Sequence, residues 1–563
     1  MNRSTIIRAN VEETRWTGAA DRTSEASRPD ASAVRRWSIA LVLLCLASLW
    51  LQFRHIDRTL PYPWDTDEGF VSGPASRTVT TGTFHPYTFN YPSLPKYLAA
   101  GGMAVGFVRA ASHLEIRDVH DIGNVGYPYY DTPRVMQGAR ELFALLAVIA
   151  LAATGIAAWH AFHEPSAILI APLMLALSPL YFYQSWTYLN VDIVGLCFST
   201  MTIAATLQGT RRPSMVRSAV IPAAFAGLAA SSKYTLALVI VPVLVAIGLY
   251  LGRGRRMWGS LLALAVMVLA FVASTPYSLI DLPNFLSGVA FETFHYARGH
   301  AGWEADPGLP QVLFYARHFV SDYGPIAVAV SLVGAAAFCV ADWRRALVLL
   351  AFPVALGWLL VSQRVHFERN VLSVHHVVTM FAAFGLITIQ RWIVAWARRR
   401  EWNSVALRRL GLGTALALLA ATIPWWHLPD EIRDRTDSRT AAVRWMIERV
   451  PADFAVVVPT QLRFDARPLK KRGTRIVEVD LQSARDADAF HRTIGEAAGA
   501  AVLLLPHWGA DERFEGQKLA DQLNALGNGL TPLKSFGRNP VLVNYAEPAP
   551  WGDPQFAIVT LRR

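Results

Sequence analysis

Long apolar runs alternate with short polar or basic connections along most of this chain. A run of roughly 20 predominantly apolar residues is long enough to cross a bilayer as a helix. The first run, SIALVLLCLASLWLQF, follows Arg35 and Arg36, and we interpret it as a retained span because no small-residue cleavage site follows. The later runs lie near residues 138–161, 165–184, 188–208, 217–232, 234–252, 257–276, 323–341, 346–362, 372–395 and 408–426. The pattern predicts a mainly α protein, a polytopic transmembrane helix bundle of about eleven spans.

Clusters of arginine punctuate the apolar runs and orient them. The clusters are Arg35-Arg36, Arg211-Arg212 with Arg217, Arg253 with Arg255-Arg256, Arg344-Arg345, and Arg398-Arg399-Arg400 with Arg408-Arg409. All of them fall on one side of the membrane if the N-terminus is cytoplasmic, as the excess of positive charge in cytoplasmic loops requires. This topology places residues 54–137, 185–187, 277–322 and everything after 427 on the outer side.

The two ends of the chain differ in composition from the apolar part. Residues 1–34 are polar and mixed in charge, which predicts a disordered cytoplasmic tail before a transmembrane domain at 35–428. After that domain, FAVVVP, TRIVEVD and AAVLLLP are typical of short buried strands, and helix-like runs lie at 437–450, 484–498 and 511–526. We therefore expect residues 429–563 to form a small extracytoplasmic α/β domain, for packing or acceptor recognition.

Composition supports a membrane protein and argues against a nucleic-acid-binding one. Apolar residues make up 53% of the 563 residues and charged residues only 17%, with a mean hydropathy of +0.29. Soluble domains of ordinary composition carry about a quarter charged residues. The formal net charge of +11 resides largely in the clusters between apolar runs, so membrane topology explains it. The three cysteines lie inside apolar runs and imply no disulfide framework.

Ionisable side chains gather at the predicted outer face. The stretch 61–98, directly after the first span, contains Asp65, Asp67, Glu68 and Lys96. Other ionisable residues at the outer ends of later spans are Asp192, Lys233, Arg364, Glu368, Arg369, His375 and His376. Such residues are expensive inside a membrane and often mark function, although any one of them can also be a snorkelling side chain. We expect carboxylates and cations to share one chamber at this face.

Several short motifs carry a resemblance to a known group of enzymes. These motifs are DTDEGF at 65–70, ASRTVTTGTFHP at 75–86, NYPSLPKYL at 90–98, NVD at 190–192, GLAASSKYT at 227–235, ERNVLS at 368–373 and DSRTAAVRW at 437–445. Together they resemble the GT-C superfamily of membrane glycosyltransferases, and most closely the branch of protein O-mannosyltransferases and the lipid A aminoarabinose transferase. The resemblance implies transfer of a sugar from a polyprenyl-phosphate donor to a lipid, glycan or protein acceptor at the outer face of a bacterial inner membrane.

The resemblance also implies roles for particular residues. Asp67 is the expected general base, with Glu68 beside it and Asp192 as the second acid of the site. Cations are needed to hold the leaving phosphate, and the candidate phosphate ligands are Lys96, Lys233, Arg364, Arg369 and His375. The candidate substrate-binding residues are Tyr91, Tyr234 and Glu368. Where the family often has Arg-Tyr and a proline-rich block, this chain has Arg369-Asn370 and later His375-His376, which leaves the phosphate ligands open.

The sequence also bears on metal binding and on an alternative function. We expect no metal site, because adjacent histidines do not share a helix face, although a divalent cation stays open. The alternative function is a transporter or flippase of lipid-linked glycans. That class places its binding site at mid-membrane, usually within internal repeats, and no repeat is evident in this sequence. The clustering of acids at the outer face therefore favours a transferase.

Overall fold

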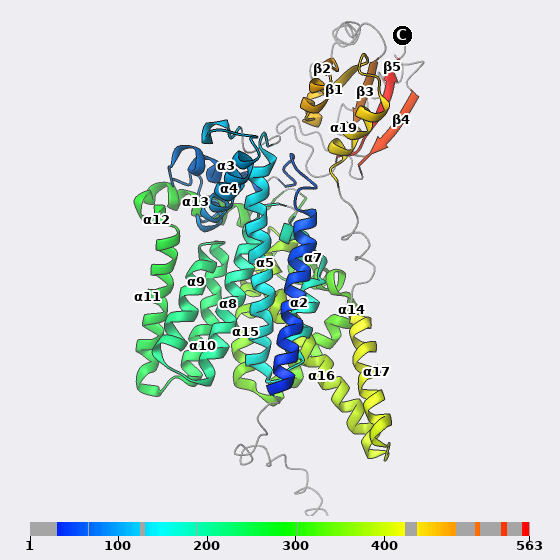
Figure 1. Ribbon diagram of the computed structural model, residues 1–563. Helices are drawn as coiled ribbons and strands as arrows, with labels where there is room; N and C mark the ends of the chain where they lie inside the picture. Colours follow the sequence, from blue (N-terminus) through cyan, green and yellow to red (C-terminus); the bar gives the residue numbers. More distant parts are fainter. Residues whose placement is uncertain are drawn as a thin grey trace, which may run out of the picture.

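The apolar runs fold into a bundle of long helices, and a small sheet lies beyond one end of it (Figure 1). The computed structural model describes residues 31–65, 67–123, 130–186, 188–300, 302–422, 436–479, 501–506, 531–537 and 554–561. Residues 1–30 of the predicted tail and the helix-like runs 484–498 and 511–526 lie outside the described residues. Helices dominate the part that is described, so the expectation of a mainly α protein is confirmed.

Each predicted apolar segment overlaps a helix of the bundle. In chain order the bundle contains α2 (Ala31–His55), α5 (Pro133–Phe162), α6 (Ala167–Ala176), α7 (Pro179–Trp186), α8 (Val191–Arg211), η2 (Val216–Val220), α9 (Ile221–Ala230), η3 (Tyr234–Val239), α10 (Ile240–Tyr250), η4 (Arg253–Arg255), α11 (Arg256–Ser274), α14 (Leu309–Ala341), α15 (Trp343–Val361), η5 (Glu368–Val374), α16 (His375–Arg399) and α17 (Ser404–Thr422). The first of these helices begins at Ala31, so it includes the last four residues of the predicted tail, 31–34.

Within the described chain, eight helices are long and apolar enough to cross a membrane. The pair α6 and α7 adds a ninth if it is counted as one span, but it is bent by 70° at its break. Two further apolar helices, Val216–Ala230 and Tyr234–Tyr250, are shorter. The chain is an integral membrane protein, while the count of about eleven crossings stays a prediction.

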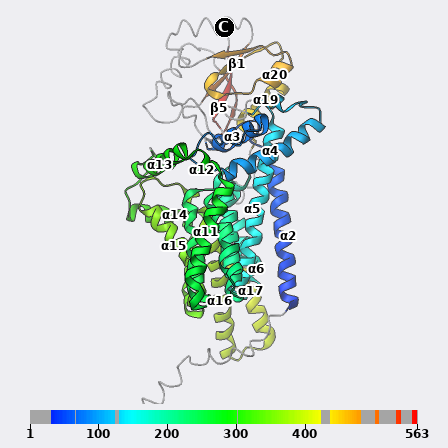
Figure 2. The ribbon, with the colours of Figure 1, turned by 90° about the vertical axis from the view of Figure 1, so that its left-hand side faces the viewer.

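A second set of helices caps one end of the bundle. It comprises α3 (Glu68–Thr81), α4 (Leu94–Ser112), η1 (Val119–Asp121), α12 (Tyr277–Ile280) and α13 (Leu282–Arg298). Figures 1 and 2 show α3, α4, α12 and α13 together at the end that faces the sheet. The α10–α11 connection, which carries Arg253, Arg255 and Arg256, lies at the opposite end. The long first loop and the loop after α11 therefore meet on one face of the molecule.

Small residues let α4 pack directly on the upper part of α5. A Cβ atom built on Gly102 would lie 2.6 Å from the Cα of Ala139, and one on Gly138 would lie 2.4 Å from the carbonyl oxygen of Gly102. These distances are far below van der Waals contact, so only glycine allows the two backbones to approach this closely. The contact fixes α4, and with it the first loop, against the membrane-spanning bundle.

The C-terminal sheet has five strands in the described residues, in the order β2-β1-β3-β5-β4. The elements of this part are α19 (Ser438–Arg449), β1 (Ala455–Pro459), η6 (Thr460–Leu462), α20 (Arg467–Lys471), β2 (Ile476–Val479), β3 (Ala501–Pro506), β4 (Thr531–Phe536) and β5 (Phe556–Leu561). β1 pairs in parallel with β2 and β3, whereas β5 pairs antiparallel with β3 and β4. The sequence predicts β1, β2 and β3 but misses β4 and β5.

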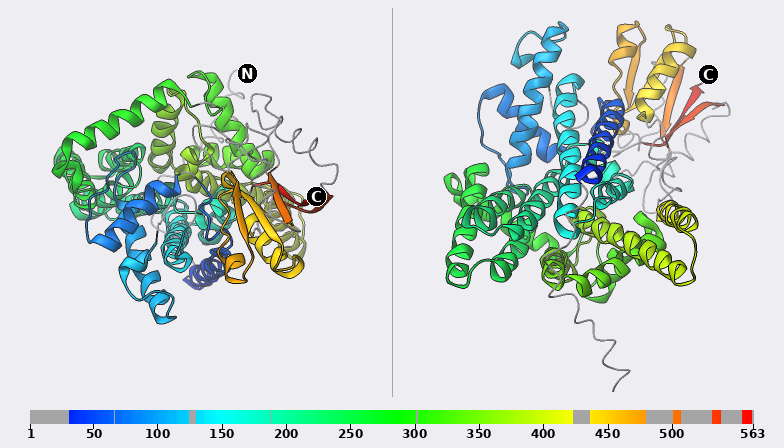
Figure 3. Two further views of the ribbon diagram at one scale, coloured as in Figure 1. Left: turned by 90° about the horizontal axis from the view of Figure 1, so that it is seen from above. Right: turned by 60° about the horizontal axis from the view of Figure 1, so that its bottom comes forward.

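The C-terminal part contacts the start of the first loop. The guanidinium of Arg439 lies 3.7 Å from the centre of the buried Tyr62 ring, and the amide of Asp465 donates to the Tyr62 hydroxyl at 2.8 Å. Arg467 forms an ion pair with Asp131 at 2.8 Å. Figure 3 shows the sheet above the same end of the bundle as α3 and α4. These contacts join the sheet to the residues just before Asp67.

Candidate active site

Asp67 lies at the start of α3, where the first loop turns back over the bundle. Its amide donates to Asp65 Oδ1 at 3.0 Å, which fixes a tight turn before the helix. Its carboxylate accepts a hydrogen bond from the Tyr91 hydroxyl at 2.9 Å and forms an ion pair with Arg369. Burial, and secondarily the charge of Asp67, raise the pKa of Tyr91 well above its ordinary value. The tyrosine hydroxyl therefore stays protonated and donates.

Arg369 connects Asp67 with the second predicted acid of the site. Its Nε lies 3.9 Å from Asp192 Oδ2, and its Nη1 lies 3.8 Å from Asp65 Oδ1. The guanidinium also lies 5.0 Å from the centre of the Phe367 ring. An arginine that faces three carboxylates and one aromatic ring is held in a single orientation, with its planar donor edge toward the site.

Asp192 is placed by the beginning of α8. The side chain of Asn190 caps this helix by accepting a hydrogen bond from the Ile193 amide at 2.9 Å, which puts Asp192 in the first turn. A carboxylate is favoured there by the positive end of the helix dipole. Asp192 Oδ1 accepts a hydrogen bond from Lys233 Nζ at 2.8 Å, so the acid predicted to need a partner has one.

Lys233 occupies a break between two short helices. α9 ends at Ala230 and η3 begins at Tyr234, so the lysine reaches inward from an extended backbone. Besides Asp192, its ammonium donates to Asn370 Oδ1 at 2.8 Å, and the Tyr296 hydroxyl donates to the same oxygen at 3.2 Å. Side chains from five separated parts of the chain thus meet around one charged centre.

A cavity of about 280 Å³ adjoins this centre. Its lining includes Tyr91, Lys233, Tyr234, Glu292 and Tyr296. Apolar side chains of α13 and α15, among them Val289 and Leu359, complete the wall. The cavity therefore combines charged groups with an apolar flank, as pockets for amphipathic ligands do.

Glu292 on α13 is a residue of this cavity that sequence reasoning missed. It accepts a hydrogen bond from Asn90 Nδ2 at 3.0 Å. Burial raises its pKa above the ordinary value of a glutamate, and the nearby Asp67 adds to the increase, while the hydrogen bond from Asn90 opposes it. The sequence signal was an acid within the aromatic run FETFHY, but its position in a long external loop gave no sign of the burial.

Glu68 does not join the centre, although it is adjacent to Asp67 in sequence. It is fully buried and forms a salt bridge with Arg140 at 2.9 Å. The amides of Trp64 and Leu189 donate to the same carboxylate, each at 3.1 Å. Every lone-pair direction of the carboxylate is therefore in use, which fits a structural role better than the catalytic one that the sequence predicts.

Lys96 also lies apart from the charged centre. It is 1% exposed and donates to the carbonyl and the hydroxyl of Thr88, the latter at 3.2 Å. Burial lowers the pKa of Lys96 to about 7. The side chain is therefore a poor fixed cation near neutral pH, and its predicted role as a phosphate ligand depends on an anion that would restore the charge.

Arg364 and Glu368 lie on more exposed parts of the outer face. Arg364 pairs with Asp306 at 3.3 Å, and more than two fifths of its side chain is exposed. Glu368, with 55% of its side chain exposed, lies 3.9 Å from His318 Nδ1. In the described residues neither side chain contacts Asp67, Asp192 or Lys233, so the structure does not bring them into the centre.

His375 belongs to a separate buried polar cluster. Its Nδ1 interacts with the Tyr323 hydroxyl at 2.9 Å, and its Nε2 lies 3.3 Å from His318 Nε2. Both ring nitrogens are therefore engaged away from the Arg369 centre, which leaves no donor for a phosphate there. Tyr234, the remaining substrate-binding candidate, donates its hydroxyl to the carbonyl of Phe89 at 2.9 Å and presents its ring to the cavity.

An anionic ligand can bind to the cations of the centre if it displaces one of the carboxylates that now pair with them. Three carboxylates, those of Asp65, Asp67 and Asp192, face the two cations, and the hydroxyl of Tyr91 adds a neutral donor. Across the described part of the chain, no group of three or more His, Cys, Asp or Glu side chains is arranged to hold a metal ion. The available chemistry is a carboxylate that can take a proton and two cations that can hold an oxyanion.

Comparisons with known proteins agree with this fold. Residues 134–280 match the family model of dolichyl-phosphate-mannose-protein mannosyltransferase, while no curated protein matches the chain. The structure resembles ArnT from Cupriavidus metallidurans bound to undecaprenyl phosphate, at 14% identity, with 93% of this chain and 98% of that chain covered and a TM-score of 0.50. The same ArnT in the apo state gives 14% identity, 94% and 98% coverage and a TM-score of 0.48.

A more distant likeness is to the apo form of the Archaeoglobus fulgidus oligosaccharyltransferase, at 11% identity, with 84% of this chain and 70% of that chain covered and a TM-score of 0.46. That likeness is too low to carry an argument by itself. The family match over residues 134–280 and the fold shared with ArnT confirm that this chain resembles the GT-C membrane glycosyltransferases.

Proposed function

We propose that this protein is a membrane glycosyltransferase that moves a sugar from a polyprenyl-phosphate donor to a hydroxyl acceptor at the outer face of a bacterial inner membrane. The observation that carries the proposal is the meeting of Asp67, Asp192, Lys233 and Arg369 beside a cavity with an apolar flank. The matched family is named for dolichyl-phosphate-mannose, and the ArnT structure contains undecaprenyl phosphate. Both names support a lipid-phosphate donor for this chain.

The transfer is a single displacement at the anomeric carbon of the donor sugar. The acceptor hydroxyl oxygen attacks this carbon, the bond from the carbon to the phosphate oxygen breaks, and polyprenyl phosphate leaves. The proton of the hydroxyl passes to the carboxylate of Asp67. Arg369 and Lys233 hold the phosphate oxygens, where negative charge develops as the bond breaks.

The ion pair between Arg369 and Asp67 couples donor binding to the base. Without a donor, the guanidinium is held in an ion pair with the carboxylate. A donor phosphate competes for the same guanidinium, because arginine binds phosphate through paired hydrogen bonds. Donor binding therefore moves Arg369 from Asp67 to the phosphate, and the carboxylate then takes the proton of the acceptor hydroxyl.

The outward placement of the site is supported by charge distribution. The cap helices α3, α4, α12 and α13 and the sheet lie at one end of the bundle, and the arginine-rich η4 connection lies at the other. Positive charge marks the cytoplasmic side of membrane proteins. The proposed topology therefore places the N-terminus in the cytoplasm, and the site and the C-terminal α/β part outside.

The proposal is tested by sugar transfer with the purified full chain. Wild-type protein, a radiolabelled polyprenyl-phosphate sugar and a membrane extract are expected to yield labelled acceptor. Asp67→Asn keeps the size of the side chain but removes the base, so we expect a 10²- to 10⁴-fold lower rate, the range contributed by a positioned acid or base. Asp453→Asn, an exposed acid of the C-terminal part, is the matched control and should transfer normally.

Two outcomes would contradict the proposal. Normal transfer by Asp67→Asn would remove the residue from the mechanism. Movement of the intact labelled lipid between leaflets, without transfer and without dependence on Asp67, would instead identify the alternative function, a transporter or flippase.

A further inference from the structure

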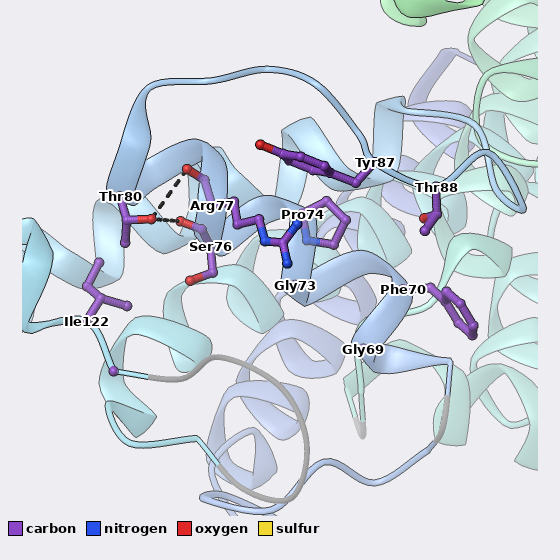
Figure 4. A pocket seen from close by; sticks show the side chains of 11 residues that line it. Gly69, Phe70, Gly73, Pro74, Ser76, Arg77, Thr80, Tyr87, Thr88 and Ile122 are labelled. Atoms are coloured by element: carbon purple, nitrogen blue, oxygen red, sulfur yellow. Dashed lines mark hydrogen bonds between the residues drawn. The ribbon is translucent and has the colours of Figure 1, made fainter. Parts of the chain in front are cut away.

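A second hollow, of about 340 Å³, lies between α3 and the loop that follows it (Figure 4). Pockets that hold small ligands measure roughly 300–1,000 Å³, so this hollow has room for a single polar ring. Its wall includes Phe70, Arg77 and Thr80 from α3, and Tyr87 and Thr88 from the loop. None of these residues belongs to the charged centre around Arg369.

Arg77 is the charged group of this hollow. Its guanidinium lies 4.5 Å from the centre of the Tyr87 ring, and Figure 4 shows the two side chains together above Gly73 and Pro74. Considering the described residues only, the guanidinium has no ion pair and no hydrogen bond. The aromatic ring thus holds an exposed cation in place while its N–H donors stay available to an oxyanion.

The backbone around the hollow is shaped to expose it. Gly69 and Gly73 are four residues apart on one face of α3, and a Cβ atom built on either would meet nothing within 4 Å. Tyr87 has a φ of 59°, a left-handed conformation that is costly for a bulky residue. Its amide donates to His85 Nδ1 at 3.0 Å, which holds this conformation and aims the ring at Arg77. Such strain is often found where a side chain must be positioned for a ligand.

Two packed aromatic rings, Phe70 and Tyr91, connect this hollow with the proposed active site. Phe70 lines the hollow, and its ring packs edge-on against Tyr91 with 6.3 Å between the ring centres. The hydroxyl of Tyr91 in turn donates to Asp67. A molecule seated against Arg77 and Tyr87 therefore lies across Phe70 and Tyr91 from the carboxylate of Asp67.

We propose that the Arg77–Tyr87 hollow is an acceptor subsite, which takes a saccharide ring that carries a phosphate or a carboxylate. This inference rests on the proposed transferase function and adds a substrate class to it. Arg77 binds the oxyanion, the ring of Tyr87 lies beside the saccharide ring, and the reacting hydroxyl of the acceptor extends past Phe70 to Asp67. The anionic group is a recognition element here and takes no part in the bond that forms.

The test measures the binding of soluble probes to the full chain in nanodiscs of neutral phosphatidylcholine. The probes are glucose 6-phosphate and glucose, followed by NMR saturation transfer, and inorganic phosphate, which has no C–H protons and is measured by its competition with glucose 6-phosphate. We expect glucose 6-phosphate to bind wild-type protein more tightly than either of the other probes. Arg77→Ala should weaken it about tenfold or more, because a charge-assisted contact is lost, and Arg77→Lys should be intermediate.

Arg298 provides a matched control, since it is also an exposed arginine stacked on an aromatic ring, 5.6 Å from the centre of Phe294, but outside both hollows. Arg298→Ala should bind the probes as wild type does.

In the transfer assay, acceptors from a membrane extract are separated by anion exchange into anionic and neutral pools. Arg77→Ala should lower the ratio of label in the anionic pool to label in the neutral pool by about tenfold, a ratio that general damage would not change.

Several results would overturn the inference. Equal binding of glucose 6-phosphate by wild type and Arg77→Ala, or equal binding of inorganic phosphate and glucose 6-phosphate, would exclude a saccharide subsite. Displacement of the probe by phosphatidylglycerol in the nanodisc would assign Arg77 to lipid headgroups.

If Asp67→Asn abolishes transfer but Arg77→Ala leaves the ratio of anionic to neutral label unchanged, the proposed function stands without this subsite. If wild type transfers no sugar, the proposed function fails, and probe binding through Arg77 then describes a saccharide site of another kind.

Discussion

The carboxylate of Glu68 and the guanidinium of Arg140 form a buried pair beneath the first turn of α3. Their side chains are 0% and 1% exposed, and Arg140 also donates to the hydroxyl of Thr59 at 2.5 Å. A buried charge that keeps its partner is tolerated, whereas one that loses its partner is strongly destabilising. The pair joins α5 to the loop that carries Asp67, so its effect on the active site is indirect.

We predict that Glu68→Gln lowers the free energy of unfolding by about 3–5 kcal/mol, because Arg140 is left with an uncompensated charge. The measurement is thermal unfolding in detergent. Glu115→Gln is the matched control, since Glu115 pairs with Arg134 at 2.8 Å but is 44% exposed. Exposed pairs contribute at most about 1 kcal/mol, so this variant should melt almost as wild type does. A Glu68→Gln protein of normal stability that transfers no sugar would instead support the catalytic role that the sequence predicts.

Residue types alone allowed part of the site to be predicted. Asp67, Asp192, Lys233 and Arg369 were expected near one another because each is an ionisable residue at the outer end of a span, where burial requires a partner. The same rule could not separate Glu68 from Asp67, since the two are adjacent and differ only in the direction that the first turn of α3 gives them. That direction is set by tertiary partners, Arg140 and the amide of Leu189, which lie far away in the sequence.

At the scale of elements, two neighbouring glycines of α4 have opposite surroundings. A Cβ atom on Gly102 would lie 2.6 Å from the Cα of Ala139 on α5, while one on Gly101 would meet nothing within 4 Å. Both residues lie in the interior of the same helix, so their intrinsic cost to helix formation is alike. Any difference between alanine variants at the two positions therefore reports the packing of α4 on α5.

We predict that Gly102→Ala destabilises the protein by about 1–3 kcal/mol, the usual cost of overpacking a tight contact. Gly101→Ala should leave stability unchanged or raise it by up to about 1 kcal/mol through helix propensity. The two variants are compared by their thermal midpoints and by hydrogen exchange of α4. Equal stability of the two would show that α4 can move away from α5 without cost, and would contradict the close packing described here.

Apolar patterning located these elements well but not their interruptions. Residues 165–184 form one apolar run in the sequence, yet the structure divides this run into α6 and α7, with a 70° bend between them. Ser178, at the break, donates its hydroxyl to Asp322 at 2.6 Å, and the amide of Leu180 donates to the same carboxylate at 2.9 Å. An acid on α14 therefore satisfies the backbone that the break leaves open, which no window along the sequence can reveal.

At the scale of the whole molecule, the C-terminal part and the first loop share one interface. The sequence predicts strands at β1, β2 and β3, because these are apolar runs, but β4 reads TPLKSF and lacks such a pattern. The sequence also gives no indication of where the sheet docks. Docking depends on Tyr62, Arg439 and Asp465, three residues whose relation exists only after folding.

The interface lies directly before the proposed catalytic base. Asp437 donates its amide to the carbonyl of Arg58 at 3.1 Å, and its carboxylate forms a buried salt bridge with Arg439 at 2.8 Å. Arg439 in turn covers the ring of Tyr62, five residues before Asp67. The C-terminal part therefore holds the segment that positions Asp67, which gives it an effect on transfer without any catalytic group of its own.

We predict that Tyr62→Leu loosens this interface and lowers sugar transfer while the bundle stays folded. The variant loses a desolvated cation–π contact, about 2 kcal/mol, and leaves the Asp465 amide without its acceptor, about 1–3 kcal/mol more. Hydrogen exchange should accelerate by about 10²-fold or more around residues 463–467, with α8 and α16 unchanged. Tyr62→Phe keeps the ring under Arg439, so it should lose only the hydrogen bond from the Asp465 amide and show a smaller effect. If exchange around 463–467 stays slow in Tyr62→Leu, the contacts through Tyr62 do not hold the C-terminal part in place, and the segment before Asp67 must be positioned by the bundle alone.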